Sequence, residues 1–362
     1  MPSTSEPQVL IERTGTLGRI RLNRPKALNS LTLAMVRDIE KALDSFEGDP
    51  DIAAVLLTGE GERGLCAGGD IRMIYEGGKA GLQEPVDFWR EEYRMNARLS
   101  RFPKPFVAFM DGIVMGGGVG VSVYASHRIV TERTRFAMPE TGIGFFPDVG
   151  ASWFLTRQPN ELGTYVALTG EPLAAWDAIA LGLADSYVPS DRLTALTETL
   201  SRLPAPALRY GFSTAVAAYV IPPPPSQFAG QQSLIDRLFA FDTIEEILEA
   251  LAQDGSDFAE RTLSVLRTKS PLSLKVTLRM LRLGRAEASL EACLEREFAA
   301  TAAVLRGHDF FEGVRAAVID KDRDPQWRPA HLGDVTADDV AAFFEPLAEP
   351  LFAGDTGKGD MR

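Results

Sequence analysis

The chain has 362 residues, of which 45% are hydrophobic and 24% charged, and its formal net charge is -12. This composition is that of a globular protein able to bury a large core, and it excludes disordered and collagen-like chains. The acidic balance argues against general nucleic-acid binding, because neutralising phosphates requires a basic surface.

The N-terminal segment MPSTSEPQVLIERTG has neither the layout of a secretory signal nor that of a transit peptide. No apolar run in the sequence approaches the roughly 20 residues that span a bilayer. We therefore expect a soluble, cytoplasmic protein that does not bind membranes. The two cysteines, Cys66 and Cys293, indicate neither a disulfide framework nor a metal cluster, so each is expected to be a small buried residue.

The first half of the chain alternates between predicted strands, glycine-rich loops and helices. Residues 9–12 and 18–22 flank the turn TGTLG and predict a β-hairpin. Residues 32–46 have apolar side chains at helical spacing, with Thr32 as the expected N-cap. The apolar runs at 52–58 and 106–110 predict buried strands, and the segment 127–131 predicts a further short strand. This alternation to about residue 190 indicates an α/β or α+β core.

Prolines mark a change of organisation after residue 204. Residues 233–251, 258–267 and 272–306 predict helices, so the C-terminal half is expected to be mostly helical. We divide the chain into an α/β core with the active site at 1–205, a mostly helical region at 206–330 and a partly ordered tail at 331–362. The end of that tail, AGDTGKGDMR, is expected to be frayed.

Two glycine motifs follow predicted strands. In CAGGDIR (66–72), adjacent glycines leave backbone N–H groups uncovered, so a ligand oxygen can approach closely. A tight turn explains a lone GG more simply. MGGGVG (115–120) leads into VGVSVYASH, for which we expect a helix beginning near Gly118 whose first N–H groups face the loop. The two loops could form an oxyanion hole, whereas neither has the spacing of a nucleotide-phosphate motif.

The third motif, FAMPETGIGFFPDVG (136–150), places Glu140 and Asp148 in an otherwise apolar stretch. Apolar surroundings raise the pKa of a carboxyl group, which suits proton transfer near neutral pH. Purely structural roles are equally compatible with the motif, with Glu140 capping a helix and Asp148 forming an Asx turn.

Together these motifs resemble the crotonase superfamily, also called the enoyl-CoA hydratase/isomerase family, and within it the 3-hydroxyisobutyryl-CoA hydrolases. The similarity also covers RLNRPKALNSL (21–31), FWREEY (88–93), SPLSLKVTLR (270–279) and RGHDFFEGVRAAVIDKDRDPQWRP (306–329). It implies a crotonase-like spiral of β-β-α units with a helical C-terminal region. It also implies hydrolysis of the thioester of 3-hydroxyisobutyryl-CoA, with 3-hydroxypropionyl-CoA as a second candidate, in valine catabolism. Neither a metal nor a cofactor is implied beyond the coenzyme A of the substrate.

The resemblance assigns roles to single residues. The amides of Gly69 and Gly117 match the oxyanion hole that binds the thioester carbonyl oxygen. Glu140 matches a catalytic glutamate, which acts through water as a general base or directly as a nucleophile. Asp148 matches a carboxylate that engages the substrate hydroxyl and assists catalysis. Glu92 matches a substrate-contacting glutamate, although an exposed helix carboxylate explains it as well.

The same resemblance places coenzyme A near two loops. The candidate CoA-binding residues are Arg24, Lys26, Ala27, Leu28, Gly68, Asp70, Ile71 and Arg72. The three cations would bind phosphate through charge-assisted hydrogen bonds, although each is equally well explained as a surface cation.

Two rival functions remain open. Hydratases of this family carry a first catalytic glutamate shortly after the GGG run, where this chain has Gly120, so hydrolysis is favoured over water addition. The rivals are an enoyl-CoA hydratase or isomerase of the same fold and a non-catalytic acyl-CoA-binding protein.

His127 and His308 are expected to be structural, since no GxSxG elbow accompanies them. Assembly into a homo-oligomer is possible.

Overall fold

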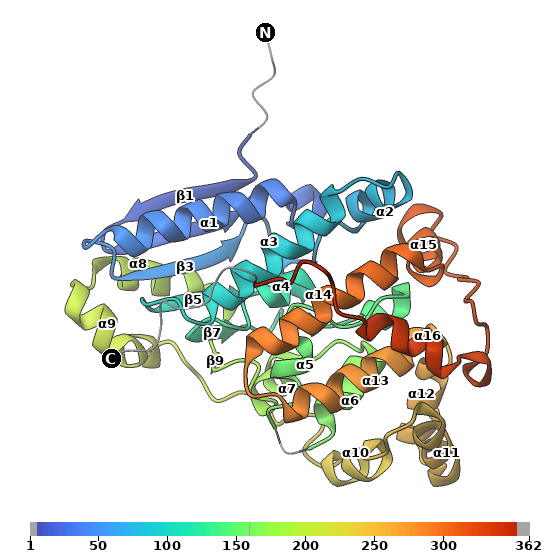
Figure 1. The fold of residues 1–362 in the computed structure, drawn as a ribbon. Coiled ribbons are helices and arrows are strands. Elements are labelled where there is room, and N and C mark those ends of the chain that lie inside the picture. The colour runs from blue at the N-terminus through green and yellow to red at the C-terminus, as the bar shows by residue number, and fades with distance from the viewer. Residues whose placement is uncertain (1–5, 159, 353–362) are drawn as a thin grey trace. The chain divides into compact units, whose positions relative to one another are not determined.

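The computed structural model describes residues 6–158 and 160–352, so the expected frayed end, AGDTGKGDMR, lies outside the described residues. The chain divides into two compact units that interleave along the sequence. The first comprises the chain up to Asp70 together with residues 98–138 and 171–232. The second comprises residues 71–97, 139–170 and the chain from Ser233 onward. Figure 1 labels the main helices and strands of both units.

A six-stranded sheet forms the frame of the first unit. Its first two strands are antiparallel, as the expected hairpin requires, and all other neighbouring pairs are parallel. In spatial order the strands are β1 (Val9–Thr14), β2 (Leu17–Leu22), β3 (Ala54–Gly59), β5 (Phe106–Met110), β7 (His127–Val130) and β9 (Ser186–Tyr187). The predicted strand at 106–110 is confirmed at its predicted bounds.

A second, three-stranded parallel sheet completes the strands of the first unit. It contains β4 (Gly64–Cys66), β6 (Ile113–Met115) and β8 (Arg135–Ala137). Each of these strands directly follows a strand of the larger sheet in the chain, so the chain passes from the larger sheet to the smaller one three times. This repetition is the expected crotonase-like spiral. Both glycine motifs lie at the carboxyl ends of strands of this smaller sheet, after β4 and β6.

Helices cover the large sheet. The helices of the first unit are η1 (Pro25–Ala27), α1 (Leu33–Gly48), α4 (Gly117–Gly120), α7 (Ala175–Ala180), η3 (Ser190–Arg192), α8 (Leu193–Arg202) and α9 (Ala205–Ala217). Thr32 is the N-cap of α1, as predicted, because its Oγ1 accepts from the Met35 amide at 3.2 Å. A Cβ atom on Gly18 of β2 would lie 2.8 Å from the Phe46 ring, so glycine lets α1 pack closely.

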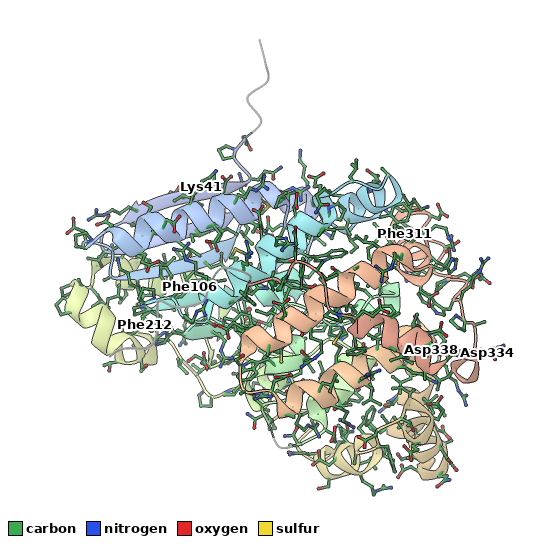
Figure 2. The ribbon with its side chains drawn as sticks, in the orientation of Figure 1. Lys41, Phe106, Phe212, Phe311, Asp334 and Asp338 are labelled. Carbon is green, nitrogen blue, oxygen red and sulfur yellow. The ribbon has the colours of Figure 1, made fainter. Side chains whose placement is uncertain are left out.

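The core of this unit lies between the sheet and its later helices. Val107 and Phe109 of β5 pack in one buried cluster with Leu196 and Leu200 of α8 and with Phe212 of α9, which is labelled in Figure 2.

The helix expected through VGVSVYASH is shorter than predicted, because it ends at Gly120 and is followed by turns. Glycines and β-branched valines are poor helix formers, which accounts for so short a helix.

The second unit is helical. Its elements are α2 (Ile71–Lys79), α3 (Glu84–Leu99, whose last two residues belong to the first unit), η2 (Glu140–Ile143), α5 (Ala151–Phe154), α6 (Leu162–Thr169), α10 (Gln232–Phe239), α11 (Ile244–Asp254), α12 (Asp257–Leu266), α13 (Pro271–Ala286), α14 (Leu290–Arg306), α15 (Asp309–Val314), the π-helical η4 (Arg315–Ile319), η5 (Leu332–Asp334), α16 (Ala337–Ala341) and η6 (Ala342–Phe344). None of the helices in the described ranges is long and apolar enough to cross a membrane.

Two of the predicted C-terminal helices are each split into two. Thr243 caps α11 within the predicted helix 233–251, and Ser289 caps α14 within the predicted helix 272–306. Both hydroxyl groups accept from a backbone amide three residues later, which starts a new helix. The prediction that the C-terminal half is helical is confirmed. The prediction that residues 233–251 and 272–306 each form one continuous helix was wrong.

Aromatic packing fixes the segment between Glu140 and Gly150 inside the second unit. The Trp89 ring of α3 stacks on Phe145 with centroids 5.6 Å apart, and Phe310 of α15 lies 5.8 Å from Phe145. A Cβ atom on Gly144 would overlap the backbone of Asp309, so glycine allows this segment to lie directly against the start of α15.

Candidate active site

In the first unit, the two glycine loops lie side by side. The Leu31 amide donates to Gly68 O at 2.8 Å and the Asp70 amide donates to Leu31 O at 2.8 Å, which fixes the first loop. A Cβ atom on Gly68 would lie 3.7 Å from the Gly117 amide nitrogen, and one on Gly118 would overlap the Cys66 carbonyl oxygen. The absence of side chains at these glycines therefore permits the close approach of the loops.

The amides of Gly69 and Gly117 are available for a ligand. Gly117 is the first residue of α4, so its N–H group has no partner within the helix. Among the residues that the structure describes, no acceptor is present for either of these two N–H groups. Uncommitted amides on two neighbouring loops are suited to bind an oxygen that carries developing negative charge.

In the second unit, Glu140 is a buried carboxylate. It is the first residue of η2 and only 6% exposed, and within the described ranges its Oε2 atom lacks a hydrogen-bond partner. Burial, followed by the nearby charge of Asp148, raises its pKa well above the ordinary value, while Lys269 opposes this rise. A buried oxygen without a partner is costly in a folded protein and typical of a ligand-binding position.

Asp148 is the second buried carboxylate of this unit. Its Oδ2 atom accepts a 2.7 Å hydrogen bond from the hydroxyl of Tyr93 on α3. Burial raises the pKa of Asp148 to about 7, and the hydrogen bond from Tyr93 moderates the rise. Asp148 therefore changes its charge close to neutral pH, as an acid or base that works there must.

Glu92 and Asn96 add unsatisfied polar atoms from α3. Glu92 is 2% exposed, so the alternative of an exposed helix carboxylate is wrong. Burial, and then the charges of Asp148 and Glu140, raise its pKa well above the ordinary value, which shows that the three carboxyl groups interact. Oε1 of Glu92 and both amide atoms of Asn96, one helical turn later, lack partners within the described chain.

Sequence analysis missed three residues of this cluster, Tyr93, Asn96 and Glu297. Tyr93 adjoins Glu92 in the FWREEY motif, so a polar aromatic residue beside a candidate site was a usable signal. Glu297 lies on α14, 149 residues after Asp148, and accepts hydrogen bonds from the amides of Gly150 and Ser152 at 2.6 and 3.0 Å. Nothing in the sequence distinguishes it from the other glutamates of that helix.

The candidate CoA-binding residues of the first unit are partly engaged. Arg24 pairs with Asp70 at 2.9 Å and donates to Ser30 O at 2.6 Å, so its charge is already compensated. Lys26 and Ala27 are exposed on η1, and Leu28 ends η1 with a φ of 54°. Gly68 belongs to the first glycine loop described above.

The remaining two CoA-binding candidates, Ile71 and Arg72, begin α2 of the second unit. The Arg72 side chain is 52% exposed and lies 3.9 Å from Glu76. Its Nη2 reaches the Val318 carbonyl oxygen of η4 at 3.5 Å. Among the candidates, Lys26 and Arg72 are therefore the cations that present charge to the solvent.

The histidines and cysteines have ordinary structural surroundings. His127 contacts Ser126 Oγ at 3.0 Å, and its ring packs 3.9 Å from the Phe212 ring. His308 precedes α15 and contacts Gln326 O at 3.0 Å. Cys66 and Cys293 are both buried, as expected.

Comparison with known proteins decides the family. The chain matches the family described as enoyl-CoA hydratase/isomerase over residues 17–344. The chain belongs to this family. The resemblance drawn from the motifs is thereby confirmed over nearly the whole length of the protein.

Curated relatives are similar over almost their full length. The rat mitochondrial 3-hydroxyisobutyryl-CoA hydrolase is 44% identical over 349 residues, which is 95% of this chain and 90% of that protein. The human enzyme of the same name is 43% identical, covering 94% of this chain and 89% of that protein. The names place these relatives in mitochondria, and a cytoplasmic location for this chain stays a prediction.

Two crystal structures share the fold closely. A carnitinyl-CoA dehydratase from Mycobacterium thermoresistibile has a TM-score of 0.90 and 45% identity, covering 97% of this chain and 100% of that chain. An enoyl-CoA hydratase from Rhodobacter sphaeroides has a TM-score of 0.86 and 41% identity, covering 94% of this chain and 98% of that chain. The relatives thus carry both hydrolase and lyase names at similar identity.

Proposed function

We propose that this protein hydrolyses the thioester of 3-hydroxyisobutyryl-CoA to the free hydroxy acid and coenzyme A, a step of valine catabolism. The corresponding 3-hydroxypropionyl thioester is a second candidate substrate. The observation that carries this proposal is the buried pair Glu140 and Asp148, in which one oxygen of Glu140 has no partner within the described residues. The names of the vertebrate relatives support the choice of substrate.

The first proposed step polarises the thioester. The amides of Gly69 and Gly117 bind the carbonyl oxygen, and they hold it more strongly as it becomes an oxyanion. In hydrolases, removal of one such donor costs ~3–4 kcal/mol of transition-state stabilisation.

Glu140 acts on the carbonyl carbon in the second step. It either removes a proton from an attacking water or attacks directly to form an anhydride that water then hydrolyses. Its raised pKa makes it a stronger base once it is ionised. In both routes the carbon–sulfur bond breaks and coenzyme A leaves as a thiolate, which takes up the proton that the attacking water loses.

The remaining residues select the substrate. Asp148 accepts a hydrogen bond from the 3-hydroxyl group, and Glu92 contacts the acyl part. Arg24, Lys26 and Arg72 provide positive charge for the phosphates of coenzyme A, supported by the backbone near Ala27, Leu28, Gly68, Asp70 and Ile71. These steps use groups of this chain and water alone, so we propose that the reaction needs neither a metal nor a further cofactor.

A hydratase or dehydratase is the second candidate, because two similar crystal structures carry such names. Hydratases position water with two glutamates, and the place of the first is Gly120, a buried residue of α4 in this chain. Without that carboxylate, water addition to a double bond loses one of its two supports, whereas thioester hydrolysis retains all the groups assigned above.

A panel of acyl-CoA esters tests the proposal. The purified protein is incubated with 3-hydroxyisobutyryl-CoA, 3-hydroxypropionyl-CoA, isobutyryl-CoA and crotonyl-CoA, and free thiol is followed with a thiol reagent. We expect thiol release from the two hydroxy esters. Loss of the conjugated absorbance of crotonyl-CoA without thiol release would support the hydratase, and binding without any turnover would support an acyl-CoA-binding protein.

A further inference from the structure

Glu297 is a fully buried carboxylate that makes three short contacts with one turn. On α14, its Oε2 accepts from the Gly150 amide at 2.6 Å. Its Oε1 accepts from the Ser152 amide at 3.0 Å and lies 2.5 Å from the Ser152 hydroxyl. The side chain has 0% exposure, so no solvent competes with these bonds.

The turn that Glu297 holds begins at Asp148 and is strained. Val149 has a φ of 52° and Gly150 a φ of 83°. The left-handed region is unfavourable for a β-branched residue, and such a conformation persists only where the surroundings enforce it. Val149 is also completely buried, so its side chain cannot leave this position without exposing apolar surface.

The other end of the turn is held by Tyr93. Its hydroxyl donates to Asp148 Oδ2 at 2.7 Å, and its ring packs edge-on against Phe298, the residue after Glu297 on α14. Asp148 therefore lies between a direct hydrogen bond from α3 and a turn whose amides are fixed by α14.

We propose that Glu297 is a positioning residue that keeps the Asp148 carboxylate on the Tyr93 hydroxyl by fixing the Asp148 to Ser152 turn. The role of Asp148 that is served in this way rests on the proposed function. Glu297 itself touches no reacting atom.

Other titratable groups face this arrangement and set its charge. The charge of Asp148 or of Glu297 raises the pKa of Glu92 and Tyr93 on α3, of Glu140 on η2 and of Cys293 on α14. Two cations oppose these effects, because Lys269 lowers the pKa of Glu140 and Arg296 lowers that of Cys293. Burial raises the pKa of Glu297 to about 8 and that of Asp148 to about 7. The charges of Asp148 and Glu297 raise each other's pKa. Loss of the Glu297 charge alone would therefore lower the pKa of Asp148, so a rise in that pKa would report the loss of the Tyr93 hydrogen bond.

Glu297→Gln tests the proposal with almost no change in volume. Both carboxylate oxygens of Glu297 accept from backbone amides. Whichever way a glutamine amide is turned, its NH2 group must face one of these N–H groups, so one bond is replaced by a repulsive contact. Ser152→Ala is a milder second variant, because it keeps the carboxylate and removes only the hydroxyl, which contacts Glu297 and Cys293.

Glu295→Gln is a matched control on the same helix. Glu295 also accepts from two backbone amides, those of Leu351 and Phe352, at 2.8 and 3.3 Å. The same substitution there disturbs the C-terminal segment but not the turn of Asp148. A general loss of helix anchoring would affect both variants alike.

The measurements are the pH profile of thiol release and, without substrate, the NMR titration of the Asp148 carboxyl carbon, assigned with Asp148→Asn. When Asp148 loses Tyr93 it loses the bond that lowers its pKa. We expect the acid limb of kcat/KM and the titration midpoint of Asp148 to rise by about one pH unit in Glu297→Gln. In Ser152→Ala we expect a smaller rise, and in Glu295→Gln none.

A lower melting temperature with an unchanged Asp148 titration in both Glu297→Gln and Ser152→Ala would overturn the proposal and leave Glu297 with a purely structural role. The NMR titration needs no turnover. If the wild type released no thiol, the proposed function would fail, while the titration would still decide on Glu297.

Discussion

The hydroxyl of Tyr93 donates a 2.7 Å hydrogen bond to Oδ2 of Asp148, and both side chains are buried in the second unit. The bond joins α3 to a turn that lies 55 residues later in the chain. It fixes the Oδ2 atom of Asp148. Because it stabilises the ionised carboxylate, it also holds the pKa of Asp148 down against the effect of burial.

Tyr93→Phe should therefore shift the pH dependence of the enzyme. Asp148 has a pKa of about 7, so activity that needs its ionised form is lost as the pH falls through that value. Removing the bond raises the pKa, and the acid limb of kcat/KM should move up by about one pH unit. Measuring kcat/KM across the neutral range checks this. If the acid limb of kcat/KM stayed at the wild-type pH, the ionisation of Asp148 would not control the pH dependence of activity.

Glu140→Gln should stabilise the protein at alkaline pH. The folded-state pKa of Glu140 is raised, so stability is highest below its ordinary value of 4.5 and is lost as the pH rises toward the folded value. A neutral amide avoids this loss, and we expect a melting temperature about 2–4 °C above that of the wild type once the pH exceeds the folded-state pKa of Glu140.

Glu312→Gln is a control for which we expect a change in melting temperature of the opposite sign. Hydrogen bonds from Arg315 lower the pKa of Glu312 to about 2. Glu312 therefore stabilises the folded protein at pH values above its ordinary pKa, and this stabilisation is lost as the pH falls toward 2. This variant should melt at a lower temperature than the wild type at neutral pH. The melting temperatures of both variants are measured as a function of pH. If both variants changed the melting temperature in the same direction relative to the wild type, the account would be contradicted.

Asp148→Asn should remove discrimination in favour of the substrate hydroxyl. A site built to bind a hydroxyl group rejects an analogue that lacks it, and we expect wild-type kcat/KM to favour 3-hydroxyisobutyryl-CoA over isobutyryl-CoA by at least about 100-fold. In the variant this ratio should approach one. A ratio that survives the substitution would assign hydroxyl recognition to another residue.

Gly118→Ala should separate the glycine loops. Its Cβ atom would overlap the carbonyl oxygen of Cys66, so the backbone of one loop must move. Loss of one oxyanion donor lowers kcat by roughly 100-fold or more. Gly48→Ala is the control in the same unit, because nothing lies within 4 Å of its added Cβ atom. Equal activity of the two variants would argue against the loops as the oxyanion hole.

Glu92→Gln should weaken substrate binding, because a buried carboxylate oxygen without a partner in the described chain is assigned to the acyl group. We expect KM to rise by roughly 10-fold, the effect of losing one hydrogen bond to a charged group. The control is Glu91→Gln, the partly exposed neighbour on the same helix. Steady-state kinetics of both variants decide whether position 92 is special.

Much of the fold could be predicted because its signals are local. Thr32, with apolar residues at helical spacing behind it, predicted α1, and the apolar run at Phe106–Met110 predicted β5. The end of α4 at Gly120 and the starts of α11 and α14 were missed, since single glycines, threonines and serines are common within longer apolar patterns. The interleaving of the two units depends on contacts distant in sequence, which composition does not report.

The candidate site was predictable only where motifs carried it. Glu140 and Asp148 stood out because they lie in an apolar, glycine-rich stretch, and both are buried carboxyl groups. Glu297 was not predictable, because its contacts with Gly150 and Ser152 span about 145 residues of sequence. A hydrogen bond between distant helices leaves no periodic signal in either of them.

Thiol release from 3-hydroxyisobutyryl-CoA by the wild type and by Glu140→Gln tests the central claim most directly, with binding of the ester measured in parallel. The account predicts that the wild type releases one thiol for each hydroxy acid formed. It predicts that the variant binds the ester as tightly but releases thiol at least about 100-fold more slowly. Equal rates of thiol release by the two proteins would contradict it.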